Sequence, residues 1–207
     1  MKILTLVSIV FLSFSVTANH DGGVMVTPEV YGVKLIEIDF CQNASCQNAI
    51  KVGGGKRINI ADTSLWGQGG TLVDLKNAPL LANTAYTYVR FKVDAQFVVK
   101  AQGQGCYTSP NKIEKGFSEG TTDQSKYGEQ VLWLDTSILY QESSFSDIEP
   151  KSFKYTHPLV GSYTKGTGQR IVWSVDATGT AALKSSSGGN CDIGVDGPEL
   201  VFTVVNN

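Results

Sequence analysis

The sequence predicts an all-β protein, a single-domain antiparallel β-sandwich stapled by disulfides. Composition is the first reason, because 22 glycines, 8 tyrosines and 9 phenylalanines accompany only 17% charged residues, as is typical of extracellular β-proteins. The second reason is that short apolar segments recur between turn-forming residues, as they do in sandwiches and barrels. The third is that no amphipathic helix longer than about two turns can be traced along the chain.

Residues 1–18 have the features of a secretory signal peptide. Lys2 precedes an apolar run from residue 3 to about residue 16, and small residues follow it up to Ala18, the expected cleavage site. Signal peptides have a basic start, an apolar core of roughly 7 to 15 residues and small residues before the cleavage site. A membrane-spanning helix needs roughly 20 apolar residues, more than this run provides. We therefore expect a secreted domain, residues 19–207, that is periplasmic or extracellular and has no membrane span.

The first long strand is predicted over residues 30–40, VYGVKLIEIDF. From Ile36 to Phe40 apolar and acidic residues alternate, which is the pattern of a half-buried strand. Val33 and Leu35 lie in the opposite phase. This change of phase predicts either a β-bulge or a strand that is covered on both faces.

Short strands separated by glycine-rich breakers make up the rest of the predicted sandwich. Residues 176–180, DATGT, have the composition of a hairpin turn between two of these strands. Residues 136–153 lack a strand pattern, so we expect a short helical turn and a long loop there. The further predicted strands are residues 49–52, 57–61, 70–75, 87–93, 97–101, 130–135, 170–177, 180–184 and 199–205.

The four cysteines are expected to form two disulfides, because an exported chain enters an oxidising compartment. A straight strand would hold Cys41 and Cys46 about 16 Å apart, but the turn-forming residues between them can close the gap to the roughly 5.5 Å between Cα atoms that a disulfide needs. We therefore expect Cys41–Cys46 and a long-range Cys106–Cys191 bond, which contributes roughly 4 kcal/mol in the chain-entropy model. Zinc or redox chemistry is disfavoured, since close C-x-x-C pairs are missing.

Part of the chain resembles a known family. An alternating strand is followed by the segment Val73-Asp74-Leu75, a short apolar link and the strand YTYVRF at residues 86–91. This order resembles a family of bacterial secreted or lipid-anchored domains of unknown function, over residues 31–99. The resemblance implies an immunoglobulin-like or transthyretin-like sandwich and brings no catalytic residue with it. Ala85 stands where that family usually has glycine, and its lipid-attachment cysteine is missing.

The search for catalytic motifs gives no candidate, and we expect a protein that is not an enzyme. The chain has two histidines, His20 and His157, and we expect His157 to be a surface or half-buried residue and not a base. Neither a G-x-S-x-G nor an H-E-x-x-H motif occurs, and residues 52–56, VGGGK, lack the spacing of a phosphate loop. The net charge of -2 argues against nucleic acid as a partner.

One acidic segment is a candidate metal site, although no other cofactor is expected. Asp192, Asp196 and Glu199 lie close together in CDIGVDGPEL, and carboxylates in extracellular loops are the ligands that calcium prefers. The spacing does not match that of an EF-hand loop. The alternative is a solvated acidic turn beside Cys191.

The three tryptophans divide into two groups. Trp133 in VLWLD and Trp173 in IVWSV lie amid apolar neighbours and are expected in the core. Trp66 lies in the glycine-rich segment SLWGQGG and is the candidate ligand-binding aromatic residue.

Two functions are compatible with these observations. The first is a secreted non-catalytic structural or interaction protein of the bacterial cell surface or extracellular matrix, which assembles with itself, as a homo-oligomer or filament, through β-strand addition. The segment 23–30, GVMVTPEV, could supply the added strand, although we favour its pairing within the same chain as an edge strand interrupted by Pro28. The second is a carbohydrate-binding β-sandwich module that binds extracellular glycan with Trp66 and nearby tyrosines.

Overall fold

A computed structural model describes residues 23–62, 75, 77–110, 118–134, 145–149, 151–185 and 190–206. Trp66, the predicted signal peptide and nearly all of the predicted strand 70–75 lie outside these residues. Strands dominate the described part of the chain, which contains a 3-10 turn at Gln124–Lys126 and no α-helix. Within it, no helix has the length and apolar character needed to cross a bilayer. The prediction of an all-β sandwich with two disulfides is confirmed.

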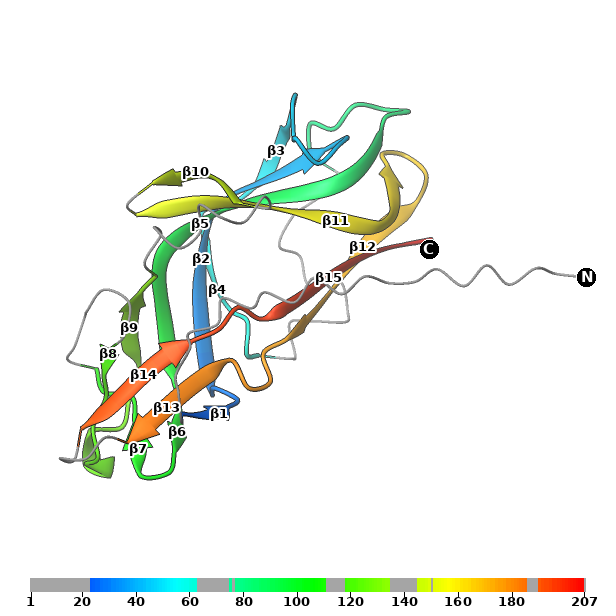
Figure 1. Ribbon diagram of the computed structural model, residues 1–207. Coiled ribbons are helices and arrows are strands. Elements are labelled where there is room, and N and C mark those ends of the chain that lie inside the picture. The colour runs from blue at the N-terminus through cyan, green and yellow to red at the C-terminus, as the bar shows by residue number, and fades with distance from the viewer. Residues whose placement is uncertain are drawn as a thin grey trace, which may run out of the picture.

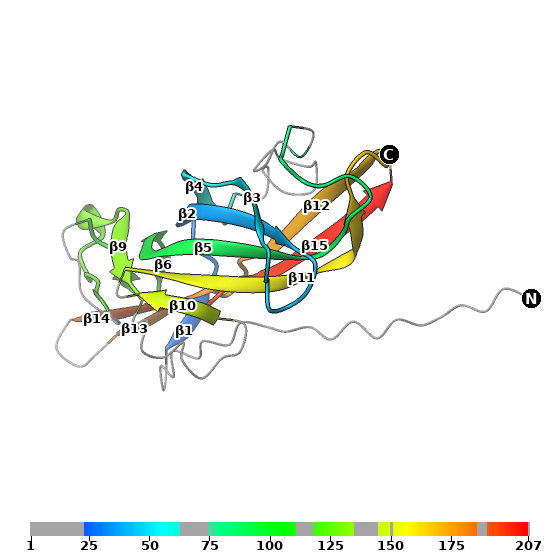
Figure 2. The ribbon, with the colours of Figure 1, turned by 90° about the horizontal axis from the view of Figure 1, so that it is seen from above.

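Three long strands form the centre of the first layer. They are β2 (Val30–Cys41), β5 (Ala85–Lys100) and β11 (Ser152–Thr164), with β5 in the middle and antiparallel to both neighbours. Figure 2 shows the three strands side by side as one curved layer. Shorter strands extend this layer: β3 (Ile50–Gly53) and β4 (Lys56–Asn59) pair with β2, β9 (Gln130–Trp133) pairs with β5, and β10 (Phe145–Glu149) pairs with β11.

The second layer is a long hairpin with one interruption, and its base continues the sheet of the first layer through one parallel ladder pair, Val160 of β11 with Thr203 of the hairpin. Its base is β12 (Gln169–Asp176) paired with β15 (Glu199–Asn206), and its far half is β13 (Ala181–Ser185) paired with β14 (Cys191–Val195). Figure 1 shows β12 continuing into β13 and β14 into β15 along one diagonal ribbon that crosses β2 and β5. Residues 177–180 and 196–198 interrupt the two arms, and the amide of Asp196 donates to the carbonyl of Thr180 across the break.

The predicted hairpin turn at residues 176–180 is therefore wrong. A turn does form, because the amide of Thr180 donates to the carbonyl of Ala177. It does not reverse the chain, however, since β12 pairs with β15 while β13 pairs with β14 in a different sheet. Turn-forming residues here produce a break within one arm of a hairpin, and turn composition alone does not distinguish the two outcomes.

The far half of the hairpin carries two small strands at its edges. The strand β1 (Val24–Val26) pairs with β13, and β8 (Ser118–Glu119) pairs with β14. The segment 23–30 therefore contributes an edge strand to its own chain, as we favoured. A further hairpin of β6 (Gln102–Gly103) and β7 (Cys106–Tyr107) follows β5.

Both disulfides connect the expected cysteines. Cys41, at the end of β2, is bonded to Cys46, with 4.9 Å between their Cα atoms. Cys106 in β7 is bonded to Cys191 in β14, with 5.6 Å between their Cα atoms. The second bond therefore ties the far half of the long hairpin to the β6–β7 hairpin that follows the central strand β5.

The change of phase in β2 arises from a bulge. The register between β2 and β5 shifts between Val33 and Leu35 and again between Leu35 and Glu37. Tyr31, Val33 and Leu35 are buried before the shift, whereas Ile38 and Phe40 are buried after it. Because an extra residue reverses which side chains point inward, both halves of β2 contribute apolar side chains to the space between the layers.

The region predicted as a helical turn and long loop, residues 136–153, is the largest error. Its described residues include β10 and the start of β11, which runs beside the central strand. Alternate residues from Phe153 to Leu159 are buried, but Pro158 and Gly161 read as strand breakers. The strand tolerates them because the pairing with β5 is interrupted between Pro158 and Tyr163. The strand β14 is a further difference, because the acidic residues of this segment indicate a turn.

One cluster of buried hydrophobic residues lies between the layers. At the hairpin side, Trp173 and Phe202 pack edge to face at 4.8 Å between ring centroids, and Phe91 of β5 lies within 5.6 Å of both rings. These three aromatic residues join the first layer to the base of the hairpin. Trp173 is thus a core residue, as expected.

Candidate functional site

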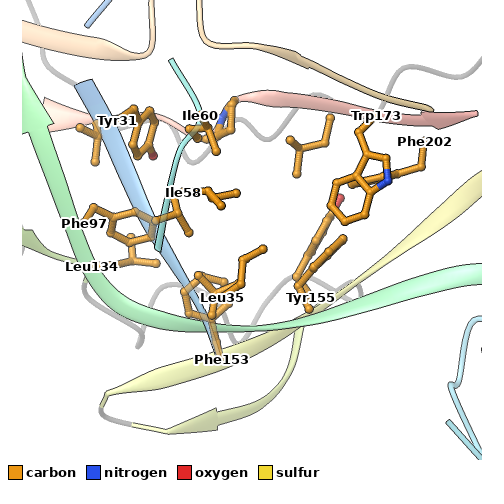
Figure 3. A pocket seen from close by; sticks show the side chains of 17 residues that line it. Tyr31, Leu35, Ile58, Ile60, Phe97, Leu134, Phe153, Tyr155, Trp173 and Phe202 are labelled. Atoms are coloured by element: carbon orange, nitrogen blue, oxygen red, sulfur yellow. The ribbon is translucent and has the colours of Figure 1, made fainter. Parts of the chain in front are cut away.

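A cavity of about 120 Å³ lies between the two layers. It is lined by 17 residues, which come from β2, β5, β11 and the segments at and after β4 and β9 in the first layer, and from β12, the end of β14, the break that follows it and β15 in the hairpin. Figure 3 shows Tyr31 and Phe97 on one side of the open space and Trp173 and Phe202 on the opposite side. None of the described residues that line the cavity carries a charge. The cavity is therefore suited to an apolar occupant.

The bulge in β2 and the break in the hairpin together shape this cavity. Tyr31, Val33 and Leu35 line it from the part of β2 that precedes the change of phase. Gly197 and Pro198, within the interruption of the second arm, line it from the other layer. Two irregularities thus face each other where regular strands would pack more closely.

Tyr31 connects the two sides of the cavity through its hydroxyl. The hydroxyl donates to the carbonyl oxygen of Asp196 at 3.0 Å, and its ring packs edge to face on Phe97 at 5.9 Å. Burial, together with the nearby Asp196 charge, raises the pKa of Tyr31 well above its usual value. The side chain is therefore neutral and fixed against the break in the hairpin.

Tyr155 makes a second connection through His157. The Tyr155 hydroxyl lies 3.1 Å from Nδ1 of His157, and the imidazole is hydrogen-bonded to the backbone of Leu200. Burial lowers the pKa of His157 to about 4, although the Leu200 carbonyl opposes this shift. The neutral ring has one N–H, and its tautomer decides whether Nδ1 accepts from the Tyr155 hydroxyl or donates to it.

These contacts show that His157 has a structural role in the wall of the cavity. Its ring packs edge to face on Phe202 at 5.1 Å between ring centroids, and its side chain is 9% exposed. Tyr155, Leu200 and Phe202, its three neighbours, all line the cavity. His157 is more deeply buried than the sequence suggested, because it lies within β11 and not at a strand end.

The acidic residues proposed for calcium do not come together. Asp192 lies in β14 opposite Lys184, whereas Glu199 begins β15 opposite Asp176 in the other sheet. Among the described residues there is no group of three or more His, Cys, Asp or Glu side chains that could hold a metal ion. The calcium expectation therefore gains no support from the geometry.

The tryptophans contribute unequally to this site. Trp173 lines the cavity. Trp133, expected in the core, is only partly buried in β9 and does not belong to the core cluster. Trp66 lies outside the described residues, so its role in ligand binding stays a prediction.

The cavity itself was not foreseen from the sequence, although one signal for it was present. The change of phase in residues 30–40 marked the bulge that brings Leu35 to the cavity. The opposite wall had no comparable signal, because Phe153 and Tyr155 fell in or beside a region read as a loop. Gly197 and Pro198 were read as part of an acidic turn.

Comparison with known proteins identifies no relative. No family model matches the chain, and neither a curated protein nor a solved structure matches it. The resemblance to bacterial secreted domains accordingly stays a prediction.

Proposed function

We propose that this is a secreted, non-catalytic binding protein of the bacterial cell surface or extracellular matrix, which holds a small apolar molecule between its two layers. The observation that carries the proposal is the cavity, because its described lining is uncharged and dominated by aromatic and branched aliphatic side chains. An apolar cavity of about 150 Å³ is known to stay dry and to bind benzene. The present cavity, at about 120 Å³, suits a molecule of similar size.

The energetic cost of an empty cavity supports the proposal. Removing packed atoms from an enclosed protein interior costs about 24 cal/mol per Å³ of residual cavity, so about 3 kcal/mol is an upper bound for this space, which is partly open to solvent. A bound apolar ligand would offset that cost by restoring van der Waals contacts. Ligand binding therefore gives a physical reason for a space that tighter packing could have filled.

The disulfides and the buried histidine support the other parts of the proposal. Two disulfides, Cys41–Cys46 and Cys106–Cys191, suit an oxidising compartment outside the cytoplasm. Burial keeps His157 neutral, and its ring nitrogens contact Tyr155 and the backbone of Leu200, so they are engaged in the wall and not offered to a substrate. A binding role fits this arrangement better than acid–base catalysis.

Toluene is a direct probe of the proposed function. At 100 times its Kd a ligand adds about 2.7 kcal/mol of stability, so we expect toluene to raise Tm by roughly 5 to 10 °C. Val33→Phe, which fills the cavity from β2, should raise Tm in the absence of ligand and should abolish the increase in Tm that toluene causes.

Val160→Phe is the matched control for this experiment. Val160 is 45% exposed and does not line the cavity, so this variant should respond to toluene as the unmodified protein does. The proposal fails when toluene leaves the Tm of the unmodified protein unchanged, or when Val33→Phe responds equally well.

Self-assembly through strand addition is a second candidate, favoured by the edge strand β12. The strand is eight residues long, contains no proline and lies at the end of its sheet with an uninterrupted register to β15. Such an edge is a template for pairing with another chain. Size-exclusion chromatography of the oxidised protein should then show oligomers that Val172→Lys reduces, whereas a monomer at all concentrations would exclude this candidate.

Glycan binding through Trp66 is an alternative that has less support than the two candidates above. Sugars need polar partners in addition to aromatic stacking, and the described lining of the cavity has few polar atoms. A glycan array with Trp66→Ala as the comparison tests this alternative directly.

A further inference from the structure

The edge strand β12 carries charges of opposite sign at its two ends. Arg170 and Asp176 are exposed and lie an even number of positions apart, so their side chains point to the same face of the strand. This is the outer face, because Ile171 and Trp173, which lie in the opposite phase, are buried. The outer face of β12 is therefore basic at one end and acidic at the other.

Among the described residues, neither charge has an ion-pair partner. Asp176 faces Glu199 in the register with β15, and like charges in this arrangement are unfavourable. Its Oδ1 accepts from the amide of Thr178 at 2.8 Å, which holds the carboxylate at the end of the strand. Arg170 faces the apolar Val205, and its side chain forms no hydrogen bond or ion pair within the described part of the chain. Each end of β12 thus lacks an opposite charge.

Length and regularity distinguish β12 from the other described sheet edges. It has eight residues, whereas β3, at the opposite edge of the same sheet, has four, and β1 and β8 have three and two. Its register with β15 is uninterrupted, and it contains no proline. Bulges, prolines and very short strands are the usual protection of an edge against pairing, and β12 has none of these.

A second copy of β12 supplies both missing charges. Two copies related by a two-fold axis pair their edges antiparallel, and facing residues then lie on the same face of the sheet. In the register centred on Trp173, Arg170 of each copy faces Asp176 of the other, and Val172 faces Ser174. Facing Cβ atoms in such a pair are about 4.5 to 5.5 Å apart, so each arginine can reach the carboxylate opposite.

The charges also select this register over its neighbours. Two-fold symmetry keeps outer side chains opposite outer side chains, so the pairing can slip only in steps of two residues. One such step places Arg170 opposite Ser174 or Thr178 and breaks both ion pairs. The register centred on Trp173 is therefore the one in which the two ends of the strand complement each other.

We propose that two copies of this protein pair edge to edge through β12, in the antiparallel register centred on Trp173, and form a closed dimer with one continuous sheet. The dimer rests on the second candidate function, self-assembly through strand addition, and adds the identity of the partner and the register. The backbone hydrogen bonds of the new ladder supply the affinity, and the two ion pairs fix the alignment. Because the same edge is used on both copies, assembly ends at two chains and produces no filament.

Charge reversal tests the register, with sedimentation velocity of the oxidised protein over a range of concentrations as the measurement. The unmodified protein should show an equilibrium between monomer and dimer. Arg170→Glu and Asp176→Lys should each raise the dimer Kd about tenfold to a hundredfold, because both ion pairs of the dimer become repulsive contacts.

Combining the two changes should restore the dimer. In an equimolar mixture of the single variants, the new glutamate of one copy faces the new lysine of the other, and Arg170 faces Asp176 at the second contact. The double variant Arg170→Glu/Asp176→Lys has both ion pairs reversed and should dimerise with a Kd near that of the unmodified protein. Recovery would also show that the single variants are folded, whereas a mixture and a double variant that both stay monomeric would overturn the inference.

Arg57→Glu is the matched control. Arg57 is exposed on β4, and its replacement changes the net charge by the same amount as Arg170→Glu. The dimer Kd of this variant should equal that of the unmodified protein. An equal weakening by both substitutions would mean that net charge, and not the pairing of β12, controls association, and would contradict the inference.

Val172→Lys separates the two levels of the proposal. If the unmodified protein is a monomer at all concentrations, self-assembly fails and the dimer fails with it. If a dimer forms that Val172→Lys disrupts but charge reversal leaves intact, pairing through β12 holds and the register centred on Trp173 is wrong.

Discussion

At the scale of single residues, burial of polar side chains was the hardest property to foresee. Asp39 was assigned to the polar face of its strand, yet it is 3% exposed and pairs with Arg90, whose Nε and Nη2 lie 3.1 and 2.8 Å from the same carboxylate oxygen. Alternation predicted which face Asp39 occupies but not what covers that face. The partner lies 51 residues away, so only the pairing of β2 with β5 brings the two together.

His157 gives the clearest prediction at this scale. Its pKa in the folded protein is about 4, compared with 6.5 for the ordinary side chain, so the unfolded chain binds a proton more readily between these values. Stability is therefore fully present above pH 6.5 and falls as the pH drops toward 4, by as much as about 3 kcal/mol. Urea denaturation across this range should show the loss.

His157→Gln is the comparison for that experiment. The variant has no group that titrates at this position, so its stability should change much less between pH 6.5 and 4.5. An equally steep decline in the variant would mean that other groups cause the pH dependence.

At the scale of elements, periodicity predicted strands well and their partners poorly. Residues 30–40 formed the expected strand, with the change of phase explained by a bulge. The strand β11 was missed because its proline and glycine resemble breakers, whereas an interruption of pairing accommodates them. Strand pairing depends on residues far apart in the chain, and a local pattern holds no information about them.

The turn after β3 allows a prediction about two neighbouring glycines. Gly54 has φ +132°, and a Cβ added there would come within 2.7 Å of Cα of Glu37 and closer still to the carbonyl oxygen of Ile36. Gly55 has φ +75° and open space around it. We expect Gly54→Ala to destabilise the protein by about 1 to 3 kcal/mol more than Gly55→Ala, because only the first adds a steric clash to backbone strain.

Thermal or chemical denaturation of the two variants measures this difference. Gly55→Ala serves as the control, since both substitutions place a side chain on a backbone with positive φ. Equal losses of stability would show that the close approach of β3 to β2 does not constrain Gly54.

At the scale of the whole molecule, cysteine spacing and the expected export predicted the covalent framework, and the fold class followed from composition. Both bonds join the expected residues. The cavity was beyond prediction, because it depends on a bulge in one layer facing a break in the other. Its two walls, around Leu35 and Pro198, belong to segments that the sequence does not connect.

The two disulfides should contribute unequally to stability. Cys106 and Cys191 are 85 positions apart, whereas Cys41 and Cys46 are 5 apart. In the chain-entropy model, replacing the long-range pair by alanine costs roughly 4 kcal/mol and replacing the short-range pair roughly 2 kcal/mol. Urea denaturation of the two double variants compares these losses, and a larger loss for the short-range pair would contradict the model.

The position of the long-range disulfide also determines which end of the sandwich opens more easily. Cys191 anchors the far half of the hairpin covalently, whereas the base of the hairpin is joined to the first layer by packed side chains and one ladder pair, Val160 with Thr203, without a covalent bond. Thermal fluctuations should therefore part the layers at the end away from the sulfur bridge. Backbone amides of β15 would then exchange hydrogen with water sooner than those of β14. A ligand would enter the cavity at this end, which is not crosslinked by a disulfide.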